Sequence, residues 1–386
     1  MTSVARTRIR PQPAHFHFLN VLYRPVLTAP WTHWQPGSRV MRNIPWLTRY
    51  YSPPSLAAGR LRPHSTPACR LRHGRTLTSS PFLHRSSDPR VRNLGREISD
   101  EYASVRDVYL TPKHPIVLAH GLLGFAELSI SSLVPPLRYW HGIEQALATQ
   151  GCPLIITASV PPSHGIEERA AKLAADISAS IASSKFSGDP VPVNIIAHSM
   201  GGLDARYMIS RLQRANSNFR VAALVTVGTP HRGSPFADYV LHESAGPLYL
   251  PRLYSLLERA GLGTRAFAQL TTRYLATEFN PRTRDDPAVR YFSYGAVVED
   301  LPLFSPFRLP QKIIAQAEGP NDGLVGVDSS RWGQYEGTLL GVSHLDLINW
   351  SNRARWTVRE WMGVKRNFNA VAFYLGIADM LAREGL

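Results

Sequence analysis

The sequence predicts an α/β fold, with a mostly parallel central sheet and helices on both faces. Two observations support this prediction. Apolar, β-branched runs of strand length recur along the chain from residue 115 onward, as strands buried on both faces require. Between several of them, apolar residues recur every three or four positions, which is the spacing of an amphipathic helix. Strands that alternate with helices in this way are typical of a parallel sheet covered on both sides.

The expected elements follow one another closely. Strands are predicted at residues 115–119, 153–157, 193–196, 221–227, 289–298, 312–315 and 338–342. Helices are predicted at residues 136–149 and 166–181 and directly after residue 201. Residues 88–113 mix polar and charged side chains, and we expect them to form a linker that leads into the fold.

Ser199 occupies a sharp turn in this pattern. The predicted strand 193–196 leads into it, and a helical pattern follows directly. A strand, a tight turn with a serine at its tip and a helix form the nucleophile elbow of α/β-hydrolases. The strained turn needs small residues two positions before and after the serine, where the chain has Ala197 and Gly201. A chance Ser-Gly turn is the alternative, but the flanking strand and helix favour Ser199 as a nucleophile.

A glycine-rich loop follows the first predicted strand, at residues 120–124. In an α/β-hydrolase this loop supplies one backbone N–H of the oxyanion hole, and the residue after the nucleophile supplies the other. The expected donors are therefore the amides of Leu122 and Met200. An ordinary glycine turn after a strand is the alternative interpretation.

Asp322 and His344 complete a chain order that fits the same chemistry. Asp322 lies in an Asn-Asp-Gly turn after the pattern at 312–315, and His344 follows the strand pattern at 338–342. The order Ser199, Asp322, His344 is that of an α/β-hydrolase catalytic triad. A turn aspartate and a surface histidine are the alternatives, since Asp-Gly turns are common.

The first hundred residues form a separate unit by composition. Residues 1–87 contain thirteen Arg and no Lys, Asp or Glu, whereas the rest of the chain has 30 basic and 28 acidic residues. Most of the net charge of +15 therefore belongs to the leader, and the body is not expected to bind nucleic acid. An Arg-rich, acid-free leader with hydroxyl residues is typical of a mitochondrial transit peptide. A disordered basic tail, a nucleic-acid arm and an extension upstream of a start at Met41 are alternatives.

We expect residues 1–100 to be this leader and its linker, and residues 101–386 to be one catalytic domain. Residues 235–285 interrupt the alternation with short amphipathic pieces, as expected of a helical cap or lid, or of helices packed permanently on the sheet. Cys152 is the one cysteine outside the leader, so no disulfide is expected in the body. No apolar run reaches eighteen residues, and no membrane span is expected.

Five ordered motifs carry a resemblance to a known family. They are His120–Gly124, Ala197–Gly201, Thr229–Asp238, Asn321–Gly323 and His344–Asp346. Together these motifs resemble the triacylglycerol lipases related to the secreted lipases of Burkholderia and Pseudomonas. With its Arg-rich leader and no disulfide, the chain is most similar in character to the fungal mitochondrial triacylglycerol lipases.

The resemblance implies a role for each site residue. Ser199 corresponds to the nucleophile, His344 to the general base and acid, and Asp322 to its orienting partner. In the bacterial relatives a calcium ion steadies the histidine loop, and Asp346 and Asp300 match its two carboxylate ligands. The amide ligand expected four residues after Asp346 is Trp350 here, which offers no side-chain oxygen.

The expected function is therefore hydrolysis of triacylglycerol or other acylglycerol esters through an acyl-enzyme, with no cofactor. Phospholipase or acyltransferase activity on the same triad, and a non-catalytic lipid-binding fold, are the alternatives. The expected partners are a neutral lipid or acyl ester and, peripherally, a lipid surface. The expected location is the mitochondrion, with the cytoplasm or the lipid-droplet surface as alternatives.

Overall fold

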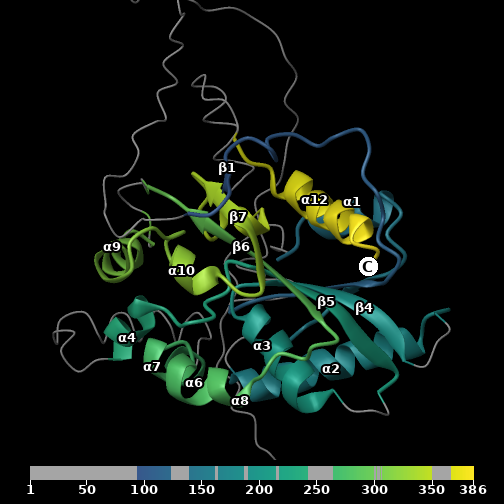
Figure 1. The fold of residues 1–386 in the computed structure, drawn as a ribbon, viewed down its shortest axis with the longest axis horizontal. Helices are drawn as coiled ribbons and strands as arrows, with labels where there is room; N and C mark the ends of the chain where they lie inside the picture. Colours follow the sequence, from purple (N-terminus) through teal and green to yellow (C-terminus); the bar gives the residue numbers. More distant parts are fainter. Residues whose placement is uncertain are drawn as a thin grey trace, which may run out of the picture. The chain divides into compact units, whose positions relative to one another are not determined.

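Parallel strands form the centre of the fold (Figure 1). The computed structural model describes residues 94–122, 139–160, 164–186, 190–213, 217–241, 264–299, 301, 305, 307–349 and 367–386. Within these residues, seven strands form one sheet in the order β1-β7-β6-β5-β4-β2-β3, and every neighbouring pair is parallel. The strands are β1 Glu97–Ile98, β2 Ile116–Ala119, β3 Ile155–Thr157, β4 Val191–His198, β5 Phe219–Val227, β6 Arg290–Val297 and β7 Gln334–Leu340.

Because all strands are parallel, the loops that follow them leave from one edge of the sheet. Ala119 at the end of β2 pairs with Ala197 on β4, and His198 at the end of β4 pairs with Val227 at the end of β5. The chain order runs outward through β2 and β3, then reverses and runs from β4 to β7. The reversal lies between β2 and β4, the place where ligand sites form in open α/β sheets.

Apolar side chains cover both faces of the sheet. One buried cluster joins β2, β6 and β7 to α1 and α12, and a second joins β2, β4 and β5 to α2 and α3. Figure 1 shows these helix pairs on opposite sides of the sheet. The helices are α1 Ile143–Thr149, α2 Ile166–Ala182, α3 Gly201–Tyr207, α4 Pro235–Leu241, α6 Thr264–Ala268, α7 Thr272–Tyr274, α8 Asn280–Arg282, α9 Arg308–Ala317, α10 Val327–Ser330 and α12 Ala370–Arg383.

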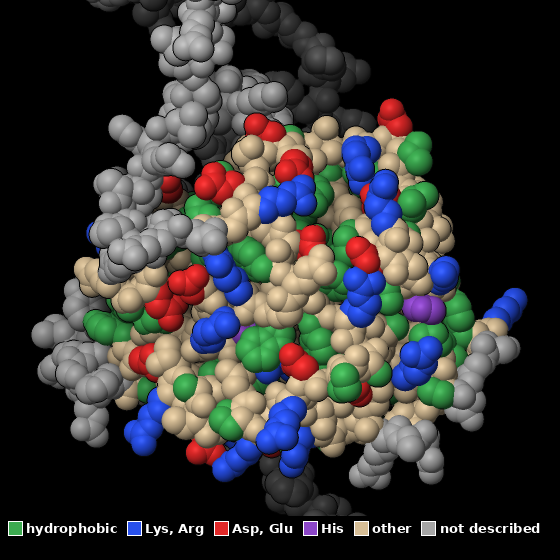
Figure 2. Space-filling model, in the orientation of Figure 1, with side chains coloured by type: hydrophobic (Ala, Val, Ile, Leu, Met, Phe, Trp, Pro, Cys, Tyr) green, Lys and Arg blue, Asp and Glu red, His purple; other side chains and the backbone are tan. Residues whose placement is uncertain are grey.

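Shorter helical turns complete the elements. Two of them are π-helical, η1 Met208–Leu212 and η2 Leu275–Phe279, and η3 Asp346–Ile348 is a 3₁₀ turn. None of the helices in the described residues combines the length and the apolar character that a membrane span requires. Figure 2 shows acidic and basic side chains interspersed over one face, in keeping with the nearly balanced charge of the body.

A third apolar cluster joins the segment 235–285 to the rest of the fold. It contains side chains of α4, α6 and η2 together with Met200 and Leu203 of the turn and helix after β4. Polar contacts also tie the segment together, because Asp238 accepts hydrogen bonds from the backbone N–H and the hydroxyl of Thr272, at 3.0 and 2.6 Å. The described parts of the segment are thus helical and packed on the fold, while residues 242–263 lie outside the described residues.

The strand predicted at 312–315 is wrong, since these residues lie inside α9. The run Lys-Ile-Ile-Ala is too short to distinguish a strand from a helix by its apolar content. In the structure Pro310 and Ile314, four positions apart, are the buried residues of α9, as one face of a helix requires.

The helix predicted from residue 136 begins only at Ile143. Gly142 before it has a φ of 77°, a left-handed conformation that interrupts a right-handed helix. The expected linker also differs, because Glu97 and Ile98 form an edge strand that pairs with Thr338 and Leu339 of β7. The leader up to residue 93 lies outside the described residues.

Candidate active site

Ser199 is held in a strained conformation directly after β4. Its φ is 56°, a left-handed value that is uncommon for a residue other than glycine and is often found at functional sites. Two hydrogen bonds fix this turn: the Ser199 N–H donates to the Val227 carbonyl at 3.0 Å, and the Thr229 hydroxyl donates to the Ser199 carbonyl at 2.8 Å. The side chain is half-buried, so the geometry is that of a nucleophile elbow.

Glycines allow other segments to approach this turn. A Cβ on Gly201 would lie 2.6 Å from the Ala119 carbonyl oxygen, and one on Gly202 would collide with the Thr229 side chain. A Cβ on Gly121 would lie 2.6 Å from the Ser199 Cβ and 3.1 Å from its Oγ. The glycine loop after β2 therefore lies directly against the Ser199 side chain.

Asp322 and His344 are paired in the structure. The Asp322 Oδ2 lies 2.7 Å from the His344 Nδ1, and both side chains are buried. The other carboxylate oxygen, Oδ1, accepts the backbone N–H groups of Leu324 and Val325 at 2.9 and 2.8 Å. Since an ionised aspartate only accepts hydrogen bonds, it keeps the proton of the His344 ring on Nδ1 and leaves Nε2 to accept another.

Two contacts bring this pair to the same edge of the sheet as Ser199. A Cβ on Gly228, the residue after β5, would lie 3.2 Å from the Asp322 Oδ2 and 3.4 Å from the His344 Nδ1. The ring of His198, the residue before Ser199, lies 4.6 Å from the His344 ring. The structure thus gathers the three predicted residues around the ends of β4 and β5.

Leu122 and Met200 lie in the segments that follow β2 and β4. Met200 is the N-cap of α3, where the first backbone N–H groups have no acceptor within the helix. Both side chains belong to the third apolar cluster, Met200 as a buried member and Leu122 as a partly buried one. Both residues thus lie where the chain leaves the sheet at the edge that also carries Ser199.

A buried ion pair braces the glycine loop. The Arg169 guanidinium lies 2.7 Å from the Asp204 carboxylate and donates from Nη2 to the His120 carbonyl at 2.9 Å. Burial raises the pKa of Asp204 to about 6, although the Arg169 charge acts in the opposite direction. The pair joins α2 and α3 to the loop at its first residue, and nothing in the sequence pattern indicated it.

Tyr139 and His198 form a second brace. The Gly121 N–H donates to the Tyr139 hydroxyl at 3.1 Å, and this hydroxyl lies 2.6 Å from the His198 Nδ1. Burial and the neighbouring His344 hold the pKa of His198 well below its usual range, so the ring is neutral and shares a hydrogen bond with the tyrosine hydroxyl through Nδ1. The loop and the residue before Ser199 are thereby linked through one side chain.

Of the three positions compared with the calcium ligands of the bacterial relatives, Asp346 lies within the described residues. The buried Asp346 carboxylate accepts hydrogen bonds from the Ser343 N–H and hydroxyl, at 3.1 and 2.6 Å, and so braces the turn after His344. Asp300 and Trp350 lie outside the described residues. In the part of the chain that the structure describes, no group of three or more His, Cys, Asp or Glu side chains is placed to hold a metal ion.

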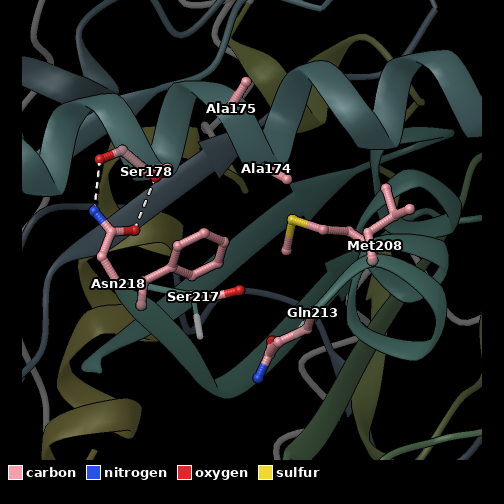
Figure 3. Close-up of a pocket in the computed structure, with 9 residues that line it drawn as sticks. Ala174, Ala175, Ser178, Met208, Gln213, Ser217 and Asn218 are labelled. Atoms are coloured by element: carbon pink, nitrogen blue, oxygen red, sulfur yellow. Dashed lines mark hydrogen bonds between the residues drawn. The ribbon is translucent and has the colours of Figure 1, made fainter. Parts of the chain in front are cut away.

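A cavity of about 510 Å³ lies elsewhere, between α2, η1 and the start of β5 (Figure 3). Its polar side chains are already paired, since the Ser178 hydroxyl donates to the Asn218 Oδ1 at 2.9 Å and the Asn218 amide returns a bond to the Ser178 carbonyl. Phe219 in its wall begins β5, whereas Val227 beside Ser199 ends it. At roughly 3.3 Å per residue, the length of the strand separates this cavity from the candidate active site.

Proteins of known families are similar to this chain in sequence. The family model described as "Putative serine esterase (DUF676)" matches residues 111–330. Triacylglycerol lipase 2 of Saccharomyces cerevisiae is 35% identical over 332 residues, which cover 76% of this chain and 98% of the yeast protein. A triacylglycerol lipase of Pseudomonas fragi is 26% identical over 328 residues, which cover 72% of this chain and 100% of that protein.

A solved structure supports the fold. The crystal structure of Staphylococcus hyicus lipase matches with a TM-score of 0.52 at 19% sequence identity, over 72% of this chain and 98% of that one. Together with the all-parallel sheet and its covering helices, this likeness confirms the predicted α/β-hydrolase fold.

Proposed function

Because this chain belongs to the triacylglycerol lipase family and is a serine ester hydrolase, we propose that it hydrolyses acylglycerol esters with Ser199 as its nucleophile. The observation that carries the proposal is the buried Asp322–His344 hydrogen bond of 2.7 Å at the sheet edge where Ser199 is strained. A histidine oriented by a buried carboxylate, near a half-buried hydroxyl in an elbow, is the arrangement that activates a serine.

The reaction proceeds in two halves. The His344 Nε2 takes the Ser199 hydroxyl proton as Oγ attacks the ester carbonyl carbon, and the oxyanion is bound by the amides of Leu122 and Met200. The carbon–oxygen bond to the glycerol then breaks, and His344 returns its proton to the leaving oxygen. In the second half, water attacks the acyl-enzyme with His344 as base, and the fatty acid leaves as Ser199 regains its proton.

The acyl chain requires an apolar surface next to the nucleophile. The third apolar cluster supports such a place, since Leu122 and Met200 share it with α4, α6 and η2. The described helices α4, α6 and η2 are then a wall of the acyl site. If this wall also moves as a lid, activity rises sharply once the ester exceeds its solubility limit, whereas a fixed wall gives no such rise.

Fatty-acid release from emulsions of triacylglycerol, diacylglycerol and phospholipid tests the substrate class. We expect release from neutral glycerides by the full-length chain, its loss in Ser199→Ala, and full activity in Ser183→Ala, a matched control on an exposed helix end. Release mainly from phospholipid would assign a phospholipase instead, and acyl transfer to an added alcohol an acyltransferase. Activity that persists in Ser199→Ala would disprove the proposed nucleophile.

The leader supports a location. With thirteen Arg and no acidic residue in residues 1–87, it carries the charge that a membrane potential draws into mitochondria. A fusion of residues 1–100 to a fluorescent reporter is expected to enter isolated mitochondria and to stay outside when the membrane potential is collapsed. Binding of the full chain to droplets of neutral lipid, without import, would favour the lipid-droplet surface.

A further inference from the structure

His120 is buried at the end of β2, and both of its ring nitrogens have defined partners. The backbone N–H of Val160 donates to Nε2 at 3.2 Å, and Nδ1 lies 3.1 Å from the Gly121 carbonyl oxygen. Because a backbone N–H can only donate, Nε2 must be the unprotonated nitrogen. The ring proton is therefore on Nδ1, from which it donates to the Gly121 carbonyl. Burial lowers the pKa of His120 to about 4, so the ring is neutral at neutral pH.

The peptide group before Gly121 is also held on both sides. The His120 carbonyl accepts the Arg169 guanidinium at 2.9 Å, and the Gly121 N–H donates to the Tyr139 hydroxyl at 3.1 Å. Two elements distant in the sequence thus fix the plane of this peptide. The next plane, which joins Gly121 to Leu122, has its carbonyl held by the His120 ring alone among the contacts that the structure defines.

The orientation of that carbonyl determines the orientation of one amide. In a planar trans peptide the carbonyl of Gly121 and the N–H of Leu122 point in opposite directions. A carbonyl held toward the His120 ring therefore directs the Leu122 N–H away from that ring. The Gly121 Cα lies against Ser199, since a Cβ there would be 3.1 Å from the serine Oγ. The amide that follows is beside the reacting atoms.

We propose that His120 is a positioning residue of the oxyanion hole: protonated on Nδ1, it holds the Gly121 carbonyl and thereby directs the Leu122 N–H at the oxyanion. This inference rests on the proposed function, because it gives Leu122 a donor role in ester hydrolysis. In the other tautomer, the Nδ1 lone pair would face the Gly121 carbonyl oxygen. Their repulsion would rotate the peptide and turn the Leu122 N–H away from the site. The Val160 N–H prevents this state by occupying Nε2.

Two substitutions distinguish the roles of the two ring nitrogens of His120. His120→Asn places an amide nitrogen at the position of Nδ1, where it can still donate to Gly121, whereas His120→Gln places it near Nε2 and leaves no donor at Nδ1. We expect His120→Asn to keep kcat for a soluble ester within a few-fold. His120→Gln is expected to lose kcat by on the order of 10²-fold, as when one oxyanion donor is removed, with KM unchanged.

Affinity for phenylboronic acid provides a second readout. Its tetrahedral adduct with Ser199 places an oxygen in the oxyanion hole, so we expect its affinity to fall in His120→Gln in parallel with kcat. If the role of His120 were purely structural, both variants would lose thermal stability, and His120→Gln would not show a selective loss of kcat at unchanged KM. Equal kcat and equal boronate affinity in the two variants would overturn the inference.

The tautomer itself can be observed in the unmodified protein. With ¹⁵N-labelled histidine, NMR is expected to show a protonated Nδ1 and an unprotonated Nε2 for His120, assigned by the proximity of its ring to the Val160 N–H. A protonated Nε2 would overturn the inference even if the variants fail to fold. The proposed function fails by a different result, namely ester hydrolysis that survives Ser199→Ala, so the two failures are distinguishable.

Discussion

Gly121→Ala tests how closely the glycine loop must approach Ser199. The added Cβ would lie 2.6 Å from the Ser199 Cβ, whereas carbon atoms in contact are about 3.5–4.0 Å apart. Either the loop or the elbow must move by roughly 1 Å to relieve this overlap. Since a displacement of that size costs on the order of 10²-fold in rate, we expect kcat to fall by about that factor, or about 2.7 kcal/mol of barrier.

Gly376→Ala is a matched control, because its Cβ would meet the Tyr102 ring at 2.5 Å, on α12 and away from the site. We expect it to lower the unfolding midpoint and leave kcat per folded molecule unchanged. The assay is steady-state hydrolysis of a soluble ester, with the active fraction counted by a fluorophosphonate probe. Wild-type kcat in a folded Gly121→Ala enzyme would refute the close approach, and an equal loss in both variants would point to general destabilisation.

Four further results are expected. Asp322→Asn should lower kcat by about 10⁴-fold in the same ester assay, because an amide does not hold the required histidine tautomer. Arg169→Met should lower the free energy of unfolding, measured in urea, by about 3–5 kcal/mol, since Asp204 is left buried without its counter-charge. The double variant Arg169→Met/Asp204→Leu should recover part of this lost stability. Burial lowers the pKa of His120 from 6.5 to about 4, so between these pH values the unfolded chain binds a proton that the folded protein does not. The free energy of unfolding should therefore fall by about 3 kcal/mol as the pH falls from 6.5 towards 4. Urea unfolding at several pH values should show a weaker pH dependence in His120→Asn. Burial raises the pKa of Cys152 to about 11, and mass spectrometry should find this thiol alkylated at pH 8 only after unfolding.

Much of the sheet and the order of the site residues could be predicted because they depend on local sequence. A strand buried on both faces is mostly apolar, as β4 and β5 are, and this pattern can be recognised without knowing which strands lie beside it. The elbow is equally local, since the strain at Ser199 requires small neighbours within the same few residues. The parallel sheet then places Ser199 after β4 and His344 after β7 at one edge, whereas Asp322 follows the helix α9.

Contacts between distant residues could not be predicted in this way. Tyr139 precedes His198 by 59 positions, and Arg169 follows His120 by 49. Residues so far apart have no helical or strand periodicity in common from which their contact could be predicted. The edge strand β1 has only two residues, too few to show a period. The pattern at 312–315 was misassigned because a short apolar run contains no information about which neighbour it will pack against.

The distribution of these contacts explains how the fold maintains the strained conformation of Ser199. A left-handed conformation costs a residue such as Ser199 about 1–3 kcal/mol, and each of its two backbone hydrogen bonds, to Val227 and from Thr229, contributes about 0.5–1.5 kcal/mol. These two bonds alone can offset the strain of the elbow. The glycine loop has no comparable support from the sheet, because β2 ends at Ala119. Its geometry therefore depends on side chains outside the reaction, namely Arg169, Tyr139 and the His120 ring, and substitutions at these positions should lower kcat even where the protein still folds.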